Sequence, residues 1–278
     1  MHYVNRNTFA NAPTVELSQL HLDEQQKWLD YKTWLNTKVP PAVNKPTSKW
    51  TKDSVRNPLT ELFKNNCAYC GNYSDKNNDG EVDHFFPKEL DENADLIYSW
   101  ENYVWACHSC NNKKRNHYPL INPCDANETA EIYFHSSDGR YLVYSKASND
   151  IKAKFKLTEE QTYINGKKCP ERRRNIFKQL ETIYLKDINR YKELYDLEFS
   201  IDLNSNDTKE MSDKLEQAFQ NLKEFLETED FILLKMQTIE KFRQTNIAFT
   251  YTYDDFSAVV GACPVGTKKF ARLNFKKD

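Results

Sequence analysis

Two Cys-x-x-Cys pairs constrain this chain more than any other feature of its sequence. They are Cys67–Cys70 and Cys107–Cys110. Four thiolates arranged in two such pairs bind zinc tetrahedrally in a closed structural site. In common zinc modules the two pairs lie about 15–20 residues apart, whereas here the whole stretch 71–106 separates them. The sequence therefore predicts a zinc-stapled segment in which a hairpin and the start of a helix are looped out between the two pairs.

The remaining cysteines indicate a reducing environment. The chain has seven cysteines, and an odd number in a sequence of 278 residues argues against a disulfide framework. We expect Cys124, Cys169 and Cys263 to be small buried apolar residues. The sequence shows no apolar run of about 18 residues and no signal-peptide core at its start. We therefore expect a soluble protein of the cytoplasm.

Within the zinc-bracketed stretch, Asp83 and His84 follow Gly80-Glu-Val, which is typical of the entry to a strand. Adjacent strand residues face opposite sides, so both side chains reach one substrate only near a strand end or bend. Phe85-Phe86-Pro87 predicts such a bend. A neutral imidazole can take a proton from water, and a carboxylate can hold a hard divalent cation. An Asp-His pair alone indicates no function, so its interpretation depends on the residues around it.

Those surroundings contain two asparagines and a lysine. Asn102 lies in Trp100-Glu-Asn-Tyr, and Asn111 follows the last cysteine of the second pair directly. Asn111 and Lys114 share one helical face at spacing i, i+3. An amide oxygen is a suitable second ligand for Mg²⁺ or Mn²⁺, and a lysine on the same face would meet phosphate. The simpler alternative, a zinc module with a purely structural role, stays open at this point.

The order C-x2-C, Asp-His, Asn, C-x2-C-Asn-x2-Lys resembles the HNH endonucleases of the ββα-metal superfamily, in the variant with a four-cysteine zinc. The resemblance covers about residues 60–122. It implies that His84 is the general base and that Asp83 and Asn111 hold a catalytic Mg²⁺ or Mn²⁺. It also implies that Asn102 ties down the loop that orients His84. His108 matches no position of the pattern. The residues expected to contact nucleic acid are Lys113, Lys114 and Arg115.

A wider likeness connects the chain with PtuB-type HNH proteins, which accompany ATPases in Septu and certain retron anti-phage systems. It rests on Asn-Cys-Ala-Tyr-Cys, Val-Asp-His-Phe-x-Pro-Lys, Trp-Glu-Asn-Tyr and Tyr-Pro-Leu-Ile-Asn-Pro. The chain departs from that group at Asp83, where relatives often carry Glu. The likeness implies a nuclease effector, acting on DNA more readily than RNA, with an ATPase as partner. The alternatives are a freestanding restriction-like HNH nuclease and a zinc module that binds nucleic acid without cutting it.

The predicted fold class is α+β and mostly helical. We expect four parts: an N-terminal helical arm and Pro-rich connector (1–57), the HNH core (58–122), a β-hairpin segment (123–165) and a helical bundle lobe (166–278). Helices are predicted over 14–36 and 58–64, and strands over 131–135 and 141–144 across the turn dipeptide Asp138-Gly139. In the lobe, Pro170 is placed in a first helical turn. Further helices are predicted over 176–195, 211–226 and 230–244.

The charge balance bears on how such a chain would hold nucleic acid. It carries 39 Lys and Arg against 41 Asp and Glu, a formal net charge of −2. Phosphate neutralisation by basic residues supplies most non-specific affinity for nucleic acid. We therefore expect either local basic clusters or a partner protein that supplies the affinity for nucleic acid. We predict that the N-terminal helix and the lobe dock to that partner.

Overall fold

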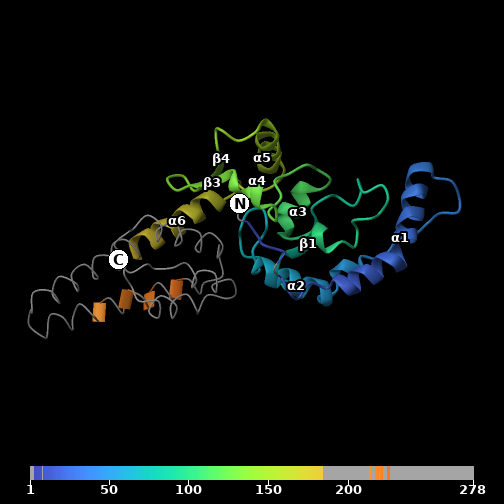
Figure 1. The fold of residues 1–278 in the computed structure, drawn as a ribbon, viewed down its shortest axis with the longest axis horizontal. Coiled ribbons are helices and arrows are strands. Elements are labelled where there is room, and N and C mark those ends of the chain that lie inside the picture. The colour runs from blue at the N-terminus through green and yellow to red at the C-terminus, as the bar shows by residue number, and fades with distance from the viewer. Residues whose placement is uncertain are drawn as a thin grey trace, which may run out of the picture. The chain divides into compact units, whose positions relative to one another are not determined.

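The computed structural model of this protein describes residues 3–7 and 9–183, together with short helical pieces at 213–214, 217–218, 220–221 and 224–225. The chain forms two compact units, Met1–Pro170 and Glu171–Asp278. The described part has six α-helices and two small two-stranded sheets (Figure 1). This confirms the predicted α+β class. None of the described helices is long and apolar enough to cross a membrane.

A hairpin and a helix form the centre of the first unit. β1 (Gly80–His84) pairs antiparallel with β2 (Tyr103–Cys107), and the register places His84 opposite Tyr103. α3 (His108–Lys114) follows β2 without a linker and packs against both strands, beside β1 in Figure 1. All five residues of β2 are buried. The stretch between the two cysteine pairs therefore contains the predicted hairpin, whereas the helix that was expected to start there begins only at His108, within the second pair.

The N-terminal helix α1 (Thr14–Thr37) confirms the helix predicted over 14–36 and packs on this centre. Trp28 is buried, with its ring 5.8 Å from that of Trp50 and its Nε1 donating to the Tyr98 hydroxyl at 3.3 Å. Trp50 lies in the short 3-10 helix η1 (Lys49–Thr51). Lys32 donates to two loop carbonyls, those of Lys88 and Asp91, at 2.5 Å each. α1 thus braces the loop that leads away from His84.

The residues before α1 also lie on the core. The amide of Val4 donates to the Pro123 carbonyl at 2.8 Å. The guanidinium of Arg6 donates to the carbonyls of Trp100 and Tyr103 and contacts the Cys124 sulfur. This segment therefore fastens the start of β2 to the chain that follows α3.

The helix predicted over 58–64 begins earlier than expected, because α2 spans Asp53–Phe63 and contains Pro58 in its interior. Three side chains spaced four residues apart, Val55, Leu59 and Phe63, are fully buried along one face. Burial contributes about 1.5–3 kcal/mol for each such side chain. An interior proline costs about 3 kcal/mol. Packing of this face outweighs the proline, which is why the start predicted from the proline was wrong.

The segment after α3 holds a short helix α4 (Ala126–Ala130) and the predicted hairpin. β3 (Ile132–His135) pairs antiparallel with β4 (Arg140–Val143), within one residue of the predicted strands. Gly139 has φ 75°, the left-handed conformation that this turn requires. The hairpin prediction is confirmed.

The helix α5 (Asn149–Gln161) follows this hairpin and was not predicted. Its buried residues are Phe155 and Thr158, so the apolar periodicity that usually indicates a helix is weak. The local signal was the N-cap Ser148, whose hydroxyl accepts from the Ile151 amide at 3.2 Å.

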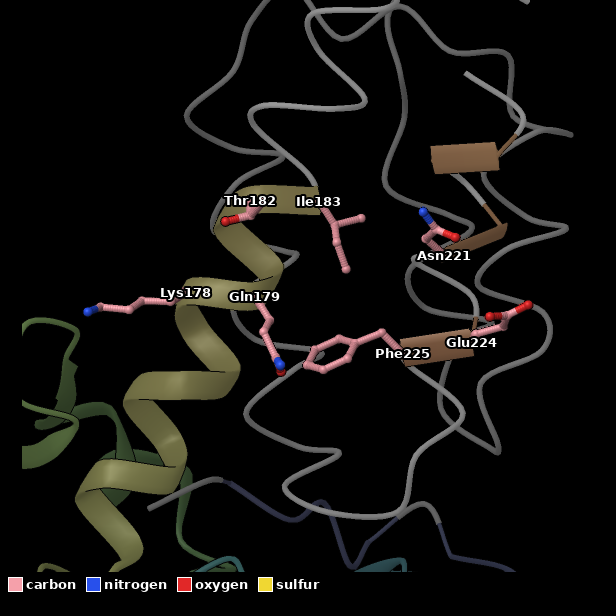
Figure 2. Close-up of a pocket in the computed structure, with 7 residues that line it drawn as sticks. All are labelled: Lys178, Gln179, Thr182, Ile183, Asn221, Glu224 and Phe225. Atoms are coloured by element: carbon pink, nitrogen blue, oxygen red, sulfur yellow. The ribbon is translucent and has the colours of Figure 1, made fainter. Parts of the chain in front are cut away.

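The helix α6 (Cys169–Glu181) leads into the second unit and begins with Pro170 in its first turn, as predicted. Within that unit a pocket of about 570 Å³ is bounded by the end of α6, by the two residues that follow it, and by Asn221, Glu224 and Phe225. Figure 2 shows Gln179 and Phe225 facing each other across it. The rest of the predicted helices over 176–195 and 211–226, and the whole of that over 230–244, lie outside the described residues.

Candidate active site and metal centre

The four cysteines of the two Cys-x-x-Cys pairs lie together where β2 ends and α3 begins. Their sulfur atoms all lie within 4.8 Å of one another and are buried. The Cys70 and Cys107 sulfurs are 3.9 Å apart. Zinc–sulfur bonds of about 2.3 Å in a tetrahedron place sulfurs about 3.8 Å apart. The spacing and the all-thiol donor set therefore fit a closed zinc site.

Backbone amides support this cluster of sulfurs. The amide of Cys110 donates to the Cys107 sulfur at 3.4 Å, and the amide of Tyr163 donates to the Cys110 sulfur at the same distance. Such N–H···S bonds orient thiolate ligands and spread their negative charge. Cys169 is buried as predicted, and its sulfur accepts from Asn72 at 3.4 Å. Cys124 is half-buried, and Cys263 lies outside the described residues.

His84 ends β1 and is enclosed by aromatic rings. The ring of Trp50 lies edge-on at 4.7 Å and that of Tyr103 at 5.2 Å. The Nε2 atom lies 2.9 Å from the carbonyl oxygen of Ile97. A carbonyl only accepts hydrogen bonds, so Nε2 carries the proton and Nδ1 holds the lone pair. Burial lowers the pKa of His84 to about 3, so the imidazole is neutral at physiological pH and its Nδ1 is unprotonated.

Asp83 precedes His84 and points to the opposite side of β1, toward α3. Its Oδ2 accepts from the Tyr69 hydroxyl at 2.6 Å, and its Oδ1 accepts from the Lys114 ammonium at 3.1 Å. The same ammonium donates to the His84 carbonyl at 2.8 Å. Burial raises the pKa of the Asp83 carboxyl, while Lys114 and Tyr69 act to lower it. Lys114 is 0% exposed, so its ammonium group contacts Asp83 inside the core and does not reach the protein surface.

We predict that Lys114→Met destabilises the fold by about 3–5 kcal/mol, because it leaves the buried Asp83 carboxylate without its counter-charge. Denaturant-induced unfolding of the zinc-loaded protein measures the change. Lys113→Met is the matched control. The double variant Asp83→Asn with Lys114→Met should recover part of the loss. A Lys114→Met protein as stable as the wild type would contradict the ion pair.

Asn102 fastens the loop on which His84 depends. It ends the 3-10 helix η2 (Trp100–Asn102). Its side-chain oxygen accepts from the Phe86 amide at 2.7 Å, and its nitrogen donates to the carbonyls of Phe86 at 3.0 Å and Leu96 at 3.1 Å. Leu96 adjoins Ile97, whose carbonyl accepts from His84. Asn102 therefore clamps the two ends of the loop beside the imidazole.

Asn111 lies one turn before Lys114 on α3, and its partner is a residue that sequence reasoning missed. Its Nδ2 donates to Oε2 of Glu81 at 2.7 Å. Oε1 of Glu81 lies 2.7 Å from Nδ1 of His108. Glu81 and Asp83 occupy the same face of β1, so α3 meets the strand in two successive pairs. The signal that could have found Glu81 is its position two residues before Asp83.

A cavity of about 660 Å³ lies beside the first half of β1. Glu81, His108 and Asn111 line it, whereas Asp83 and His84 do not. Its other walls come from η1, α2, the turn before β1 and β1 itself, through Trp50, Thr51, Arg56, Lys76, Asn78, Asp79, Gly80 and Val82. Asn111 therefore lines an open cavity, whereas Asp83 does not.

The three basic residues expected to contact nucleic acid point in different directions. Lys114 faces inward. The Lys113 ammonium donates to the Thr162 carbonyl at 2.7 Å and lies 4.8 Å from the centre of the Tyr163 ring. Arg115, exposed just after α3, donates to the Asn112 carbonyl. These residues therefore do not form one continuous basic patch in the described structure.

Comparison with known proteins agrees with this geometry. Residues 67–117 match the family model described as HNH endonuclease. The ββα unit, the four cysteines and the Asp83–His84 pair all lie within the match. This part of the chain is an HNH endonuclease domain, which confirms the resemblance inferred from sequence.

The chain is also similar to two curated proteins, each named Septu protein PtuB. The one from Bacillus thuringiensis is 37% identical over 81 residues, which are 27% of this chain and 31% of the relative. The one from Bacillus mycoides (strain KBAB4) is 25% identical over 197 residues, 56% of this chain and 65% of the relative. The chain thus spans less than two thirds of either relative. No solved structure shows a significant match.

Proposed function

We propose that this chain is a divalent-metal-dependent endonuclease that hydrolyses phosphodiester bonds, with DNA favoured over RNA. The observation that carries the proposal is the state of His84 inside an HNH domain. Its Nε2–H is engaged by the Ile97 carbonyl, so the neutral ring offers the Nδ1 lone pair. A residue held in that tautomer can act as a general base.

In the proposed reaction His84 Nδ1 takes a proton from water, and the resulting hydroxide attacks phosphorus in line as the bond to the 3′ oxygen breaks. Mg²⁺ or Mn²⁺, held by Asp83 and Asn111, would stabilise the charge on the transferring phosphate. Each Asp83 oxygen accepts one hydrogen bond and retains a second lone pair. Asn102 keeps the loop in place, and Lys114 fixes the Asp83 carboxylate.

The four cysteines are proposed to hold Zn²⁺ for folding alone. A site closed by four protein sulfurs leaves no open position for water or substrate. Nucleic-acid contacts are proposed for Lys113 and Arg115, which flank the site, while Lys114 acts through Asp83.

The physiological role is proposed to be that of a nuclease effector in an anti-phage defence complex that contains an ATPase. Support comes from the two relatives named Septu protein PtuB and from the nearly neutral charge balance. α1 adds a structural reason, because Val15 and Leu22, seven residues apart on one face, are 85% and 73% exposed. Docking of α1 to a partner would cover these two side chains.

Purification of a tagged chain from its native operon, followed by nuclease assays, tests both parts of this proposal. We expect an ATPase to co-purify and the complex to cut plasmid DNA when Mg²⁺ or Mn²⁺ is present. A chain that emerges alone and cuts duplex DNA efficiently at physiological salt would refute the partner and favour a freestanding enzyme. If neither DNA nor RNA is cut under any of these conditions, the endonuclease proposal fails.

A further inference from the structure

The two carboxylates that β1 directs toward α3 differ in access. The Asp83 side chain is 6% exposed, and both of its oxygens are engaged by Tyr69 and Lys114. The Glu81 side chain is 39% exposed and lines the 660 Å³ cavity. Glu81 is therefore accessible to a cation from solvent, whereas Asp83 does not line this cavity.

Glu81 is also held in a fixed position. His108 and Asn111, three residues apart on α3, each contact one of its oxygens at 2.7 Å. The amide of His108 in turn donates to the Asp79 carbonyl at 2.7 Å. Asn111 uses its amide nitrogen in this contact, so its Oδ1 remains available as a ligand. A carboxylate and an amide oxygen thus stand side by side at the cavity wall.

A further acidic residue borders the same space. Asp79 lines the cavity, and its Oδ1 is buried with no hydrogen-bond partner in the described part of the chain. A buried acceptor without a partner is unfavourable unless water or a cation satisfies it. Oxygen donors of this kind are the ones that Mg²⁺ and Mn²⁺ prefer.

We propose that Glu81 is a ligand of the catalytic divalent cation, alongside Asn111, and that His108 is the positioning residue that holds Glu81 in place. This inference rests on the proposed function and adds to it a residue that the HNH resemblance does not assign. It places the cation at the cavity wall, where Mg²⁺ or Mn²⁺ can keep several of its waters.

Mn²⁺ binding to the zinc-loaded full chain, followed by electron paramagnetic resonance, tests this assignment. The test variant is Glu81→Gln, because a glutamine amide can still accept from Asn111 and donate to His108, so the fold should be kept. The expected result is an Mn²⁺ dissociation constant raised at least about tenfold. Glu101→Gln, an exposed glutamate on the same core, should bind Mn²⁺ like the wild type. Zinc content and thermal unfolding establish that both variants are folded.

Asp83→Asn, measured in parallel, separates this inference from the proposed function. If Glu81→Gln weakens Mn²⁺ binding, the inference is upheld whatever Asp83→Asn does. If Glu81→Gln binds Mn²⁺ like the wild type while Asp83→Asn does not, the inference is wrong and the proposed function stands. If the wild type binds no Mn²⁺ and cuts no nucleic acid, both fail together. Weaker Mn²⁺ binding by His108→Gln, with Glu81 intact, would support the positioning role.

Discussion

His84→Gln protein, purified with the same partner as the wild type, is expected to cleave nucleic acid about 10²–10⁴-fold more slowly, which is the usual contribution of a general base. Glutamine is the informative replacement. Its amide nitrogen can take over from Nε2 as donor to the Ile97 carbonyl, whereas its amide oxygen is too weak a base to remove a proton from water. Single-turnover nicking of plasmid DNA in Mg²⁺ measures the loss.

His117→Gln is the matched control, because His117 is an exposed histidine just after α3 on the same core. It should cut at the wild-type rate. The His84→Gln protein should retain its zinc and unfold at nearly the wild-type temperature, because Trp50 and Tyr103 still enclose the side chain. A folded His84→Gln protein that cuts at full rate would show that His84 is not the general base.

The second large effect concerns folding. Cys107→Ser is expected to abolish zinc binding and cooperative unfolding of the first unit. The ββα unit consists of a two-stranded hairpin and a seven-residue helix. Neither element is stable alone in water. Structural zinc supplies about 10–16 kcal/mol in zinc-finger peptides at neutral pH. Replacement of Cys67, Cys70 or Cys110 should have the same outcome.

Cys124→Ser provides the control for this loss. Its sulfur accepts from Arg6 at 3.2 Å, and a serine hydroxyl can accept in its place. This variant should keep its zinc and lose at most about 1 kcal/mol of stability. Circular dichroism during thermal unfolding, with zinc measured per chain, compares the two. A Cys107→Ser protein that unfolds cooperatively without zinc would show that the metal is dispensable for the fold.

The centre of the molecule could be predicted from sequence because its chemistry leaves few options. Two Cys-x-x-Cys pairs imply four converging sulfurs, and the long stretch between them implies a folded insert. The structure has both, with the sulfurs within 4.8 Å of one another. The hairpin β3–β4 was predictable for a similar local reason, since Gly139 can adopt the positive φ of its turn.

Other features depended on packing that the sequence does not display. The sequence suggests that Lys114 is a surface lysine in a basic run, but in the structure it forms a buried ion pair with Asp83. Glu81 reads as an ordinary strand residue until α3 brings Asn111 and His108 against it. Pro58 indicates a helix start, yet the buried face of α2 extends beyond it. In each case a contact between segments overrides the local pattern.

One measurement tests the central claim that a structural zinc and a separate catalytic cation serve one active site. The wild-type chain, purified together with its partner, is treated with a mild chelator, and plasmid cleavage and zinc content are followed as Mg²⁺ or Mn²⁺ is restored. The account predicts no cleavage after chelation, one zinc per chain throughout, and full cleavage on restoring Mg²⁺ or Mn²⁺. Cleavage that persists without added cation, or that rises and falls with zinc content, would contradict it.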